Sequence, residues 1–535
     1  MLWYKNALFY SLDVDTFLDA NGDGTGDFHG LCDRLEYIAD LGCTCLWLLP
    51  FYPSPNRDNG YDVKDYFGID SRLGTMDDFR AFIRKARELD IRILIDLVVN
   101  HTSVEHPWFQ EARRDRNAPY RDYYVWSDEP LAYEKEHLML TGEEDTMWTY
   151  DPVAGQYYLH RFYKEQPDLN IACPAVRDEI RRIIEFWLKE GVSGFRIDAA
   201  EMLIEPYGIR GAEVKELETF LDELRDYVAG INPEAMLLAE TNSAPDQMKV
   251  YMNGRTRMHM VFNFFVNQYL FLSLATESGE PLARALEQLP EPHPDNQYLN
   301  FLRHHDELSL KLLNKGEREA VFQAFAPDEE MRIFDRGIRR RLASMLGNDR
   351  QRIEFTYSLL LSLPGTPLIR YGEELGMGED LSLPGRNSVR TPMQWSAGAN
   401  GGFSAAPPEK LVRPPIREGR EGFPTLNAAQ AEADPSSLLH WMRSAIRQRK
   451  KAALIGTGRF RLLPAPKPSV LLFCYEQEGQ RLLCLHNFSG VPVQLPFPSE
   501  SQGTPALLLQ DTESEINGNE IHLGPYGYLW LDQGQ

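Results

Sequence analysis

The chain has 535 residues, of which 43% are hydrophobic and 25% charged, so it is long enough for two or three globular domains. Its formal net charge of −23 opposes binding to nucleic acid or to an anionic membrane, and it favours neutral small molecules as partners. No apolar stretch approaches the roughly 20 residues that a membrane-spanning helix requires. The six cysteines lack CxxC or zinc-site spacing, so we expect reduced thiols and a cytoplasmic location.

The first half of the chain alternates apolar runs, which predict strands, with amphipathic runs, which predict helices. In chain order these runs are residues 7–14, 31–41, 43–49, 79–86, 91–99, 176–189 and 194–197. Thr75 and Asp78 have the spacing of a capping box before the second predicted helix. Residues 91–99 are almost continuously apolar, as a strand covered on both faces must be. Repeated βα units of this length predict an α/β fold, most simply a (β/α)₈ TIM barrel.

Two parts of the chain break this alternation. Residues 102–173 are rich in Tyr, Trp, Asp and Pro and contain no clear βα unit, which predicts an insertion (B) domain after the third strand. From about residue 453, short apolar runs separated by turns predict a small all-β domain, a β-sandwich spanning 453–535. The catalytic barrel is therefore expected to comprise residues 1–101 and 174–452.

Two short basic runs interrupt the acidic composition, at residues 336–341 and 447–451. Both stretches have helix-like spacing. We therefore expect either solvated helix faces or salt bridges to the excess of carboxylates, and not a nucleic-acid surface.

Polar residues directly follow several predicted strands, and in a barrel the carboxyl ends of the strands line the active site. These residues are Asp96, Asn100 and His101 after the third strand, Arg196 and Asp198 after the fourth, Glu240 after residues 236–239, and His305 and Asp306 after residues 298–302. Glycoside cleavage needs one carboxylate to attack the anomeric carbon, one carboxylic acid to protonate the leaving oxygen, and polar groups to hold the ring hydroxyls. Any single acid here is explained as well by a helix cap or a loop salt bridge. Their occurrence at successive strand ends predicts a site for glycoside cleavage.

Several of these residues lie in blocks that resemble, in order, the signature regions of the α-amylase family, glycoside hydrolase family 13. The blocks are residues 96–101, residues 166–170, residues 194–198, Glu240 and residues 305–306. The resemblance implies a retaining mechanism with Asp198 as nucleophile, Glu240 as general acid/base and Asp306 on the 2- and 3-hydroxyls of a distorted sugar ring. It implies that Arg196 lowers the pKa of Asp198, whereas Glu240 needs a raised pKa to act as an acid.

The same resemblance assigns a set of residues to substrate binding. The set comprises Asp58, Tyr61, His101, Arg196, His305 and Arg390. Asp58 and Tyr61 would form the floor of the glucose subsite, the two histidines would hold sugar hydroxyls, and Arg390 would lie at the same pocket.

The segment from Asp19 to Asp27 is typical of a loop that binds a hard cation, calcium or magnesium. Asp19, Asn21, Asp23 and Asp27 provide oxygens between glycines as in an EF-hand, although Gly30 stands where an EF-hand has its final glutamate. Related α-glucosidases bind a cation in this loop, and a tight Asx-turn is the alternative. The resemblance implies a second, structural calcium site between barrel and insertion, formed by Asn100, Asp168, Glu205 and the backbone oxygens of Met202 and Leu203. No organic cofactor is expected.

Within the family the chain most resembles the trehalose synthases, which isomerise maltose and trehalose. Residues 148–158 resemble their insertion domain, and residues 337–343 and 346–350 resemble their helical insertion after the seventh strand, expected here at about 312–352. The resemblance implies interconversion of these sugars by intramolecular glucosyl transfer, with hydrolysis as a side activity and a small α-linked disaccharide or oligosaccharide as substrate. It also allows for a homodimer. The alternative is an α-glucosidase or transglucosylase that acts on short α-glucosides.

The sequence departs from the trehalose synthases in loops expected to close the active site. The loop at 206–210 is shortened, and Lys311 stands where they carry an acid. Isomerisation requires glucose to stay caged beside the covalent intermediate, so these departures predict a leakier site that releases more free glucose. On the sequence alone, Lys311→Glu is expected to shift the products toward isomerisation if that position contacts the lid.

Overall fold

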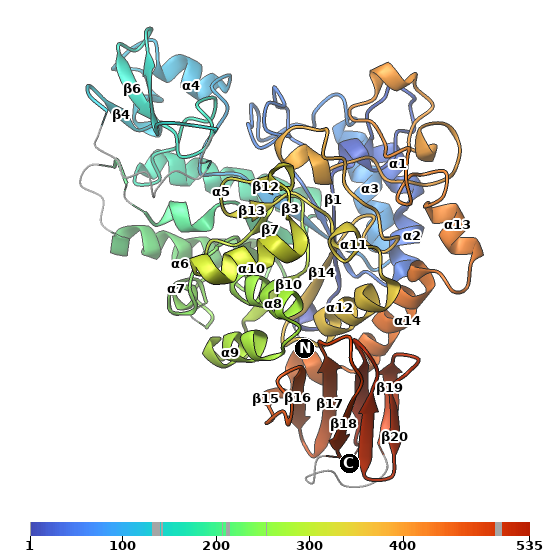
Figure 1. Cartoon of the computed structure of the whole chain (residues 1–535). Helices are drawn as coiled ribbons and strands as arrows, with labels where there is room; N and C mark the ends of the chain where they lie inside the picture. The colour runs from blue at the N-terminus through green and yellow to red at the C-terminus, as the bar shows by residue number, and fades with distance from the viewer. Residues whose placement is uncertain are drawn as a thin grey trace.

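The computed structural model describes residues 2–130, 140, 143–205, 207–209, 214–252, 254–497 and 505–534. At its centre is a closed barrel of eight strands (Figure 1). Around the barrel these are β1 (Phe9–Leu12), β2 (Cys45–Leu48), β3 (Arg92–Leu97), β7 (Gly194–Ile197), β8 (Met236–Ala239), β9 (Met260–Phe262), β10 (Gln297–Phe301) and β14 (Thr366–Arg370). Neighbouring strands are parallel, and β14 closes the barrel against β1. The predicted fold class is confirmed.

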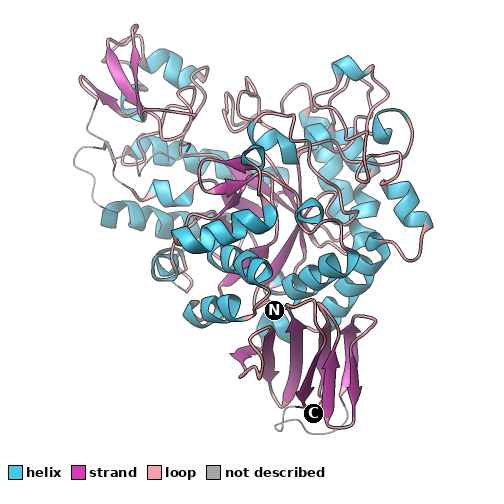
Figure 2. Cartoon of the chain, viewed as in Figure 1, coloured by secondary structure: helices cyan, strands magenta, loops and turns pink. Residues whose placement is uncertain are grey.

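Helices cover the outside of the barrel (Figure 2). They are α1 (Phe28–Asp33), α2 (Leu35–Leu41), α3 (Met76–Glu88), α5 (Pro174–Glu190), α6 (Val214–Ile231), α7 (Pro245–Tyr251), α8 (Phe264–Thr276), α9 (Glu280–Gln288), α12 (Arg350–Ser362), α13 (Ala428–Ala433), α14 (Leu438–Lys451) and α15 (Leu454–Thr457). The helix predicted at 31–41 is two helices, divided at Arg34. The capping box before α3 is confirmed, since the Thr75 hydroxyl accepts from the Asp78 N–H and the Asp78 carboxylate accepts from the Thr75 N–H.

The insertion between β3 and α5 has a small sheet of its own. It contains α4 (Pro107–Ala112), β4 (Trp126–Ser127), β5 (Trp148–Asp151) and β6 (Gln156–Leu159). The strands are antiparallel in the order β4-β6-β5. Two isolated bridges, His101 with Asp168 and Tyr124 with Leu169, tie the start and end of the insertion together at the end of β3.

The segment after β10 is only partly helical. It contains β11 (Leu308–Ser309), α10 (Lys315–Phe325), β12 (Arg332–Ile333), β13 (Gly337–Ile338) and α11 (Leu342–Met345). The three strands form a sheet in the order β11-β13-β12. The basic run at 336–341 is therefore strand and loop, and the helical expectation was wrong there. Its alternative holds, since Arg340 pairs with Glu379 at 2.7 Å and Arg341 with Glu373 at 3.4 Å.

The C-terminal part forms two antiparallel sheets. One has the order β15 (Arg459–Leu462), β16 (Val470–Gln477), β17 (Gln480–Asn487), β22 (Tyr528–Asp532), β19 (Ala506–Gln510), and the other β18 (Val493–Pro496), β21 (Glu520–Leu523), β20 (Glu515–Asn517). The first sheet packs on the barrel helix α12, where the Trp530 indole N–H donates to the Ser358 hydroxyl at 3.1 Å. Figure 1 shows these sheets and the insertion at opposite ends of the molecule. The C-terminal sheets therefore lie far from the ends of the barrel strands that carry the predicted site.

All six cysteines are free thiols, as expected, and four of them are buried. The eight strands of the barrel enclose a compact apolar core that includes Trp47, Phe262 and Phe301. None of the helices built by the described residues combines the length and the apolar character needed to cross a membrane.

Candidate active site

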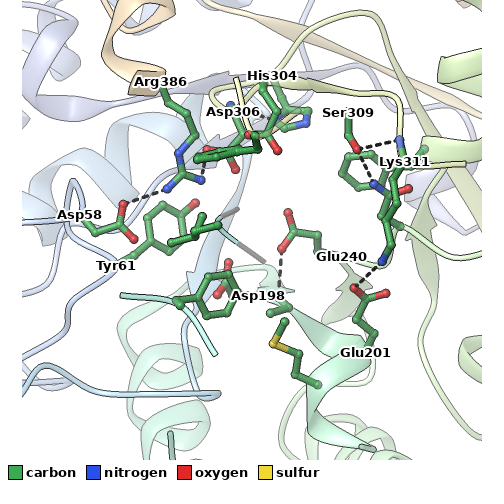
Figure 3. Close-up of a pocket in the computed structure, with 18 of the residues that line it drawn as sticks. Asp58, Tyr61, Asp198, Glu201, Glu240, His304, Asp306, Ser309, Lys311 and Arg386 are labelled. Carbon is green, nitrogen blue, oxygen red and sulfur yellow. Dashed lines mark hydrogen bonds and ion pairs between the residues drawn. The ribbon is translucent and has the colours of Figure 1, made fainter. Parts of the chain in front are cut away.

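One pocket at the carboxyl ends of the barrel strands collects most of the predicted site residues (Figure 3). Six of the nine predicted catalytic and substrate-binding residues line it, namely Asp58, Tyr61, His101, Asp198, Glu240 and Asp306. The pocket has about 910 Å³ of space, including its part open to solvent. Arg196, His305 and Arg390 lie behind this lining.

Arg196 connects the two predicted catalytic acids. It is 1% exposed, and its Nη1 lies 2.5 Å from Asp96 Oδ1 and 2.6 Å from Asp198 Oδ1, while its Nη2 lies 2.6 Å from Glu240 Oε1. Arg196 and Asp198 are two residues apart, so both point into the barrel. Ala199 then adopts a left-handed conformation with φ 46°, and its N–H donates to Glu240 Oε2 at 3.0 Å. This sharp turn places the nucleophile beside the acid.

Burial raises the pKa of Asp198 to about 6 and that of Glu240 to about 7, and Arg196 opposes the shift in both. Arg196 lowers the pKa of Asp198 in the expected direction, but the cost of removing the carboxylate from water exceeds the attraction of the guanidinium, so the net shift is upward. The order of the two values still suits the predicted roles. Near pH 6.5 Asp198 is mostly ionised and Glu240 mostly protonated, as a nucleophile and a general acid require.

Asp306 is held ionised by two arginines. Its Oδ1 accepts from Arg386 Nη1 at 2.8 Å and from Arg390 Nη2 at 2.7 Å. Burial alone would raise the pKa of Asp306, but Arg386, His305 and Arg390 together hold it well below its usual value. Arg386 also donates to Asp58 Oδ1 at 3.0 Å, so it bridges two carboxylates of the pocket wall (Figure 3).

Besides Arg196, two further residues predicted to bind sugar, His305 and Arg390, lie outside the lining of the pocket. His305 Nε2 is 2.8 Å from Tyr61 Oη and 3.1 Å from Asp306 Oδ2, and burial lowers the pKa of His305 to about 4. Arg390 Nε donates to the His305 carbonyl at 2.9 Å. Both therefore position Tyr61 and Asp306 from behind. Arg386, four residues before Arg390 in the same block, occupies the place that the sequence analysis gave to Arg390.

Several further residues line the pocket that were not predicted from the sequence as site residues. They are Glu201, Asn242, His304, Glu307, Ser309, Phe334, Arg336 and Arg386, together with Lys311, which the sequence singled out only as a departure. Glu201 and Glu307 each follow a predicted catalytic aspartate within three residues, which is a signal that could have found them. Phe334 and Arg336 come from the β12–β13 hairpin and have no comparable signal.

The loop from Asp19 to Asp27 is folded by its own hydrogen bonds. Asp19 accepts from the N–H groups of Gly22 and Gly24 at 2.7 and 2.8 Å, and Asn21 accepts from the Asp23 N–H at 2.8 Å. Asp27 caps α1 by accepting from the Gly30 N–H at 2.7 Å. Within the described part of the chain, Asp19, Asp23 and Asp27 do not bring three carboxylate oxygens within 4.8 Å of one another. The geometry thus matches the Asx-turn alternative, and a cation in this loop remains a prediction.

At the junction of barrel and insertion, the predicted calcium ligands surround the guanidinium of Arg161. Arg161 Nε donates to Asp168 Oδ2 at 2.5 Å, and its Nη2 donates to Asn100 Oδ1 at 2.8 Å and to the Met202 carbonyl at 3.1 Å. Glu205 Oε2 lies 3.6 Å from Nη1, which has no hydrogen-bond partner. Leu203 is buried in the same turn. These oxygens converge on one position and stabilise a positive charge there.

The arrangement presents the groups that cleavage of a glycosidic bond requires. Asp198 presents a carboxylate oxygen to the pocket, Glu240 presents a carboxylic acid, and Asp306, Asp58 and Tyr61 present polar atoms to a sugar ring. An ionised Asp306 opposite a developing oxocarbenium ion stabilises positive charge in the transition state. Asp96 lies beneath Arg196, and burial raises its pKa to about 7, so it positions the guanidinium without touching substrate.

Comparison with family models identifies the chain. Residues 14–323 and 332–458 match the catalytic domain of α-amylases. The chain belongs to the α-amylase family. Residues 460–530 match the C-terminal domain of maltogenic amylases.

Similar proteins within the α-amylase family show which of its members this chain resembles. The chain is 42% identical over 547 residues to a trehalose synthase of Pimelobacter sp., covering 99% of this chain and 95% of that protein. It is 40% identical over 542 residues to a trehalose synthase/amylase of Mycobacterium tuberculosis, covering 99% and 90%. Among solved structures, the trehalulose synthase of Pseudomonas mesoacidophila has a TM-score of 0.79 at 26% identity, covering 99% of both chains. The chain is thus a trehalose-synthase-like enzyme of this family.

Proposed function

We propose that this enzyme interconverts maltose and trehalose by intramolecular glucosyl transfer, with hydrolysis as a side reaction. The observation that carries the proposal is the arrangement of Asp198 and Glu240 on one guanidinium, with Asp306 ionised across the pocket. The trehalose synthases at 40–42% identity support trehalose as one of the two sugars.

The reaction proceeds through a covalent intermediate. Asp198 attacks the anomeric carbon while Glu240 gives its proton to the glycosidic oxygen, so the bond to that oxygen breaks and free glucose forms. The glucose turns within the pocket, and Glu240 removes the proton from its 1-hydroxyl as that oxygen attacks the anomeric carbon. The ester bond to Asp198 then breaks and trehalose forms. Water in place of glucose gives hydrolysis.

Product analysis tests this proposal. Purified enzyme is incubated with maltose and, separately, with trehalose, and the sugars are quantified by chromatography at early times. We expect each disaccharide to form from the other, with free glucose as a minor product. Release of glucose alone from both sugars would contradict isomerisation and leave α-glucosidase activity.

A glucosidase or transglucosylase for short α-glucosides is the second candidate. Lys311 favours it, because the sequence resemblance predicts an acid at that position and Lys311 lines the pocket. A trehalose-6-phosphate hydrolase of Bacillus licheniformis also shares the fold, with a TM-score of 0.79 at 25% identity. Glucose formation from maltose without trehalose, or oligosaccharide formation, would select this candidate.

We also propose a structural calcium ion at the junction of Asn100, Asp168 and Met202. The ligand types support it, since carboxylate, amide and carbonyl oxygens are the ligands that calcium prefers. The Arg161 guanidinium already fills the point where these oxygens converge, so calcium binds there only if that side chain moves away. Calcium would take the position of the Arg161 guanidinium and hold the insertion to the barrel. It would take no part in the chemistry.

A further inference from the structure

The pocket has two sides, and the catalytic acids lie between them. Figure 3 shows Asp58 and Arg386 on one side, with Glu201 and Lys311 on the other. The first side holds the ionised Asp306 and its arginine bridge. It is therefore the side that binds the glucose whose anomeric carbon reacts with Asp198.

The position of Glu240 determines where the second sugar must lie. The general acid donates its proton to the oxygen that joins the two sugars, so the second sugar lies beyond that oxygen. Figure 3 shows Glu240 between Asp198 and the pair formed by Glu201 and Lys311. A disaccharide with one ring at Asp58 and Asp306 thus places its other ring against this pair.

Glu201 and Lys311 come from loops that follow different barrel strands. Glu201 lies in the turn Ala200–Leu203 after β7, and Lys311 follows β11, which lies after β10. Lys311 Nζ is 3.8 Å from Glu201 Oε1, and the side chains are 36% and 19% exposed. Both therefore retain surface that faces the pocket.

Neighbouring hydrogen bonds fix the carboxylate and the loops around it. Glu201 Oε2 accepts from the Ser243 hydroxyl at 3.3 Å, and Asn242 Nδ2 donates to the Ser309 hydroxyl at 2.9 Å. These contacts join the loops after β7, β8 and β10 on one side of the pocket. A change that separates Glu201 from Lys311 loosens this side.

We propose that Glu201 and Lys311 form the subsite for the second sugar and determine how the glucosyl-enzyme divides between transfer to glucose and hydrolysis. This inference rests on the proposed function. The pair offers a carboxylate acceptor and an ammonium donor to neighbouring hydroxyls of one ring, and it holds two loops together while released glucose turns over. Separating the pair admits water to the intermediate.

The charges of the pocket favour a neutral sugar over a phosphorylated one. The lining contains six carboxyl residues (Asp58, Asp198, Glu201, Glu240, Asp306, Glu307) and three cationic ones (Lys311, Arg336, Arg386). Lys311 is already paired with Glu201. Carboxyl groups outnumber cationic groups around the pocket as a whole, which favours a neutral sugar over a phosphorylated one.

The pairing reverses the effect expected for Lys311→Glu from the sequence alone. A glutamate at this position would face the carboxylate of Glu201, and like charges at this separation repel. We therefore expect Lys311→Glu to reduce isomerisation. Exchanging the two charges, in Glu201→Lys with Lys311→Glu, should recover part of it.

The test compares two substrates in single and double variants. Maltose carries a second sugar, whereas α-glucosyl fluoride has only a fluoride to release and needs little help from Glu240. Lys311→Met and Glu201→Gln should each lower the ratio of trehalose to glucose formed from maltose about tenfold, the effect of losing one hydrogen bond to a charged group. On the fluoride, kcat/KM should fall by a much smaller factor. In the double variant the trehalose-to-glucose ratio should be no lower than in the single variant with the lower ratio, because the two side chains act as one unit.

Lys311→Arg and Lys249→Met are the matched controls. Lys311→Arg keeps the charge and should retain most of the trehalose-to-glucose ratio. Lys249 pairs with Asp246 on the surface and is 63% exposed, so its loss should change neither substrate. The inference would be overturned if the trehalose-to-glucose ratio were unchanged in both Lys311→Met and Glu201→Gln. It would also be overturned if kcat/KM fell by the same factor on maltose and on the fluoride.

Failure of the proposed function would be recognised separately. If the wild-type enzyme forms no trehalose, isomerisation is excluded while the subsite is still tested by hydrolysis. In that case Lys311→Met should raise KM for maltose about tenfold, the equivalent of about 1.4 kcal/mol. The same substitution should change KM for the fluoride by a much smaller factor. Equal changes in the two KM values would overturn the subsite.

Discussion

Among the residues that the structure describes, Arg196 carries the only positive charge that pairs directly with Asp96, Asp198 and Glu240. One guanidinium cannot neutralise three buried carboxylates. At least one of them therefore keeps its proton near neutral pH, and the pKa values of about 6 for Asp198 and about 7 for Glu240 describe a coupled pair. The shared arginine thus makes the acid and the nucleophile depend on each other.

Asp198→Asn tests the nucleophile. An amide cannot form the glucosyl ester, so kcat for maltose should fall by about 10⁴-fold or more, as when other covalent nucleophiles are removed. Arg196 keeps two carboxylate partners in this variant, so thermal unfolding should stay close to that of the wild type. Activity within tenfold of the wild type, in a folded variant, would disprove the assignment.

The pH dependence of kcat/KM reports both acids. Activity needs Asp198 ionised and Glu240 protonated, so it should rise as pH passes about 6 and fall as pH passes about 7. A bell with its maximum near pH 6.5 is expected for maltose. For α-glucosyl fluoride the alkaline limb should weaken, because that leaving group needs little protonation. Activity on maltose that stays constant up to pH 9 would contradict the role of Glu240.

For single residues, the sequence predicts which side chains are catalytic better than it predicts the surroundings of those side chains. Asp198, Glu240 and Asp306 are found from their positions at strand ends, and all three line the pocket. Arg386 is missed because its bridge between Asp58 and Asp306 spans residues far apart in the chain. The pKa of Asp198 is misjudged because burial cannot be read from a sequence pattern.

The β12–β13 hairpin has a turn with two left-handed residues. Arg332 pairs with Ile338, and the residues at its tip, Phe334 and Asp335, have φ values of 55° and 56°. Left-handed conformations cost about 1–2 kcal/mol for residues other than glycine. Phe334 is 7% exposed and lines the pocket, whereas Asp335 is exposed to solvent. The strained turn therefore holds an aromatic ring at the active site.

Two substitutions test separately the contribution of the Phe334 ring to substrate binding and the cost of the left-handed backbone at Asp335. Phe334→Ala removes apolar surface that can pack on a sugar, so KM for maltose should rise about tenfold, as expected for about 1.4 kcal/mol of lost contact. Asp335→Gly relieves the left-handed strain at an exposed position and should raise Tm with KM unchanged. Steady-state kinetics and thermal melts measure both. An unchanged KM in Phe334→Ala would exclude the ring from substrate binding.

Several elements could not be predicted from periodicity. The barrel strand β9 has three residues, too few to show a pattern. The break between α1 and α2 at Arg34 and the strand at 337–338 depend on tertiary packing. The long strands and the capped helix α3 carry strong local signals and agree with the predicted elements.

At the scale of the whole molecule, the junction between barrel and insertion depends on a buried cation. Differential scanning fluorimetry of protein treated with EDTA tests whether calcium can fill that position. Calcium should raise Tm, since a ligand that binds only the folded state stabilises it. The rise should be larger in Arg161→Met, where the guanidinium no longer competes for the Asn100 and Asp168 oxygens. No rise in either protein would exclude calcium at the junction.

The order of the large units follows from the sequence, and their packing does not. The βα alternation predicts the barrel, and the change of pattern after residue 101 predicts the insertion. The meeting of Glu201 with Lys311 joins the loops after β7 and β10, which are more than 100 residues apart. No local pattern contains that contact, so the acceptor side of the pocket becomes visible only in three dimensions.

Intramolecular transfer is the central claim, and isotopic labelling tests it most directly. The enzyme is incubated with unlabelled maltose and an excess of uniformly ¹³C-labelled glucose, and the trehalose formed at early times is analysed by mass spectrometry. If the released glucose stays in the pocket until it attacks the glucosyl-enzyme, the trehalose will be predominantly unlabelled. Trehalose carrying one labelled ring in proportion to the free glucose pool, or no trehalose at all, would contradict the account.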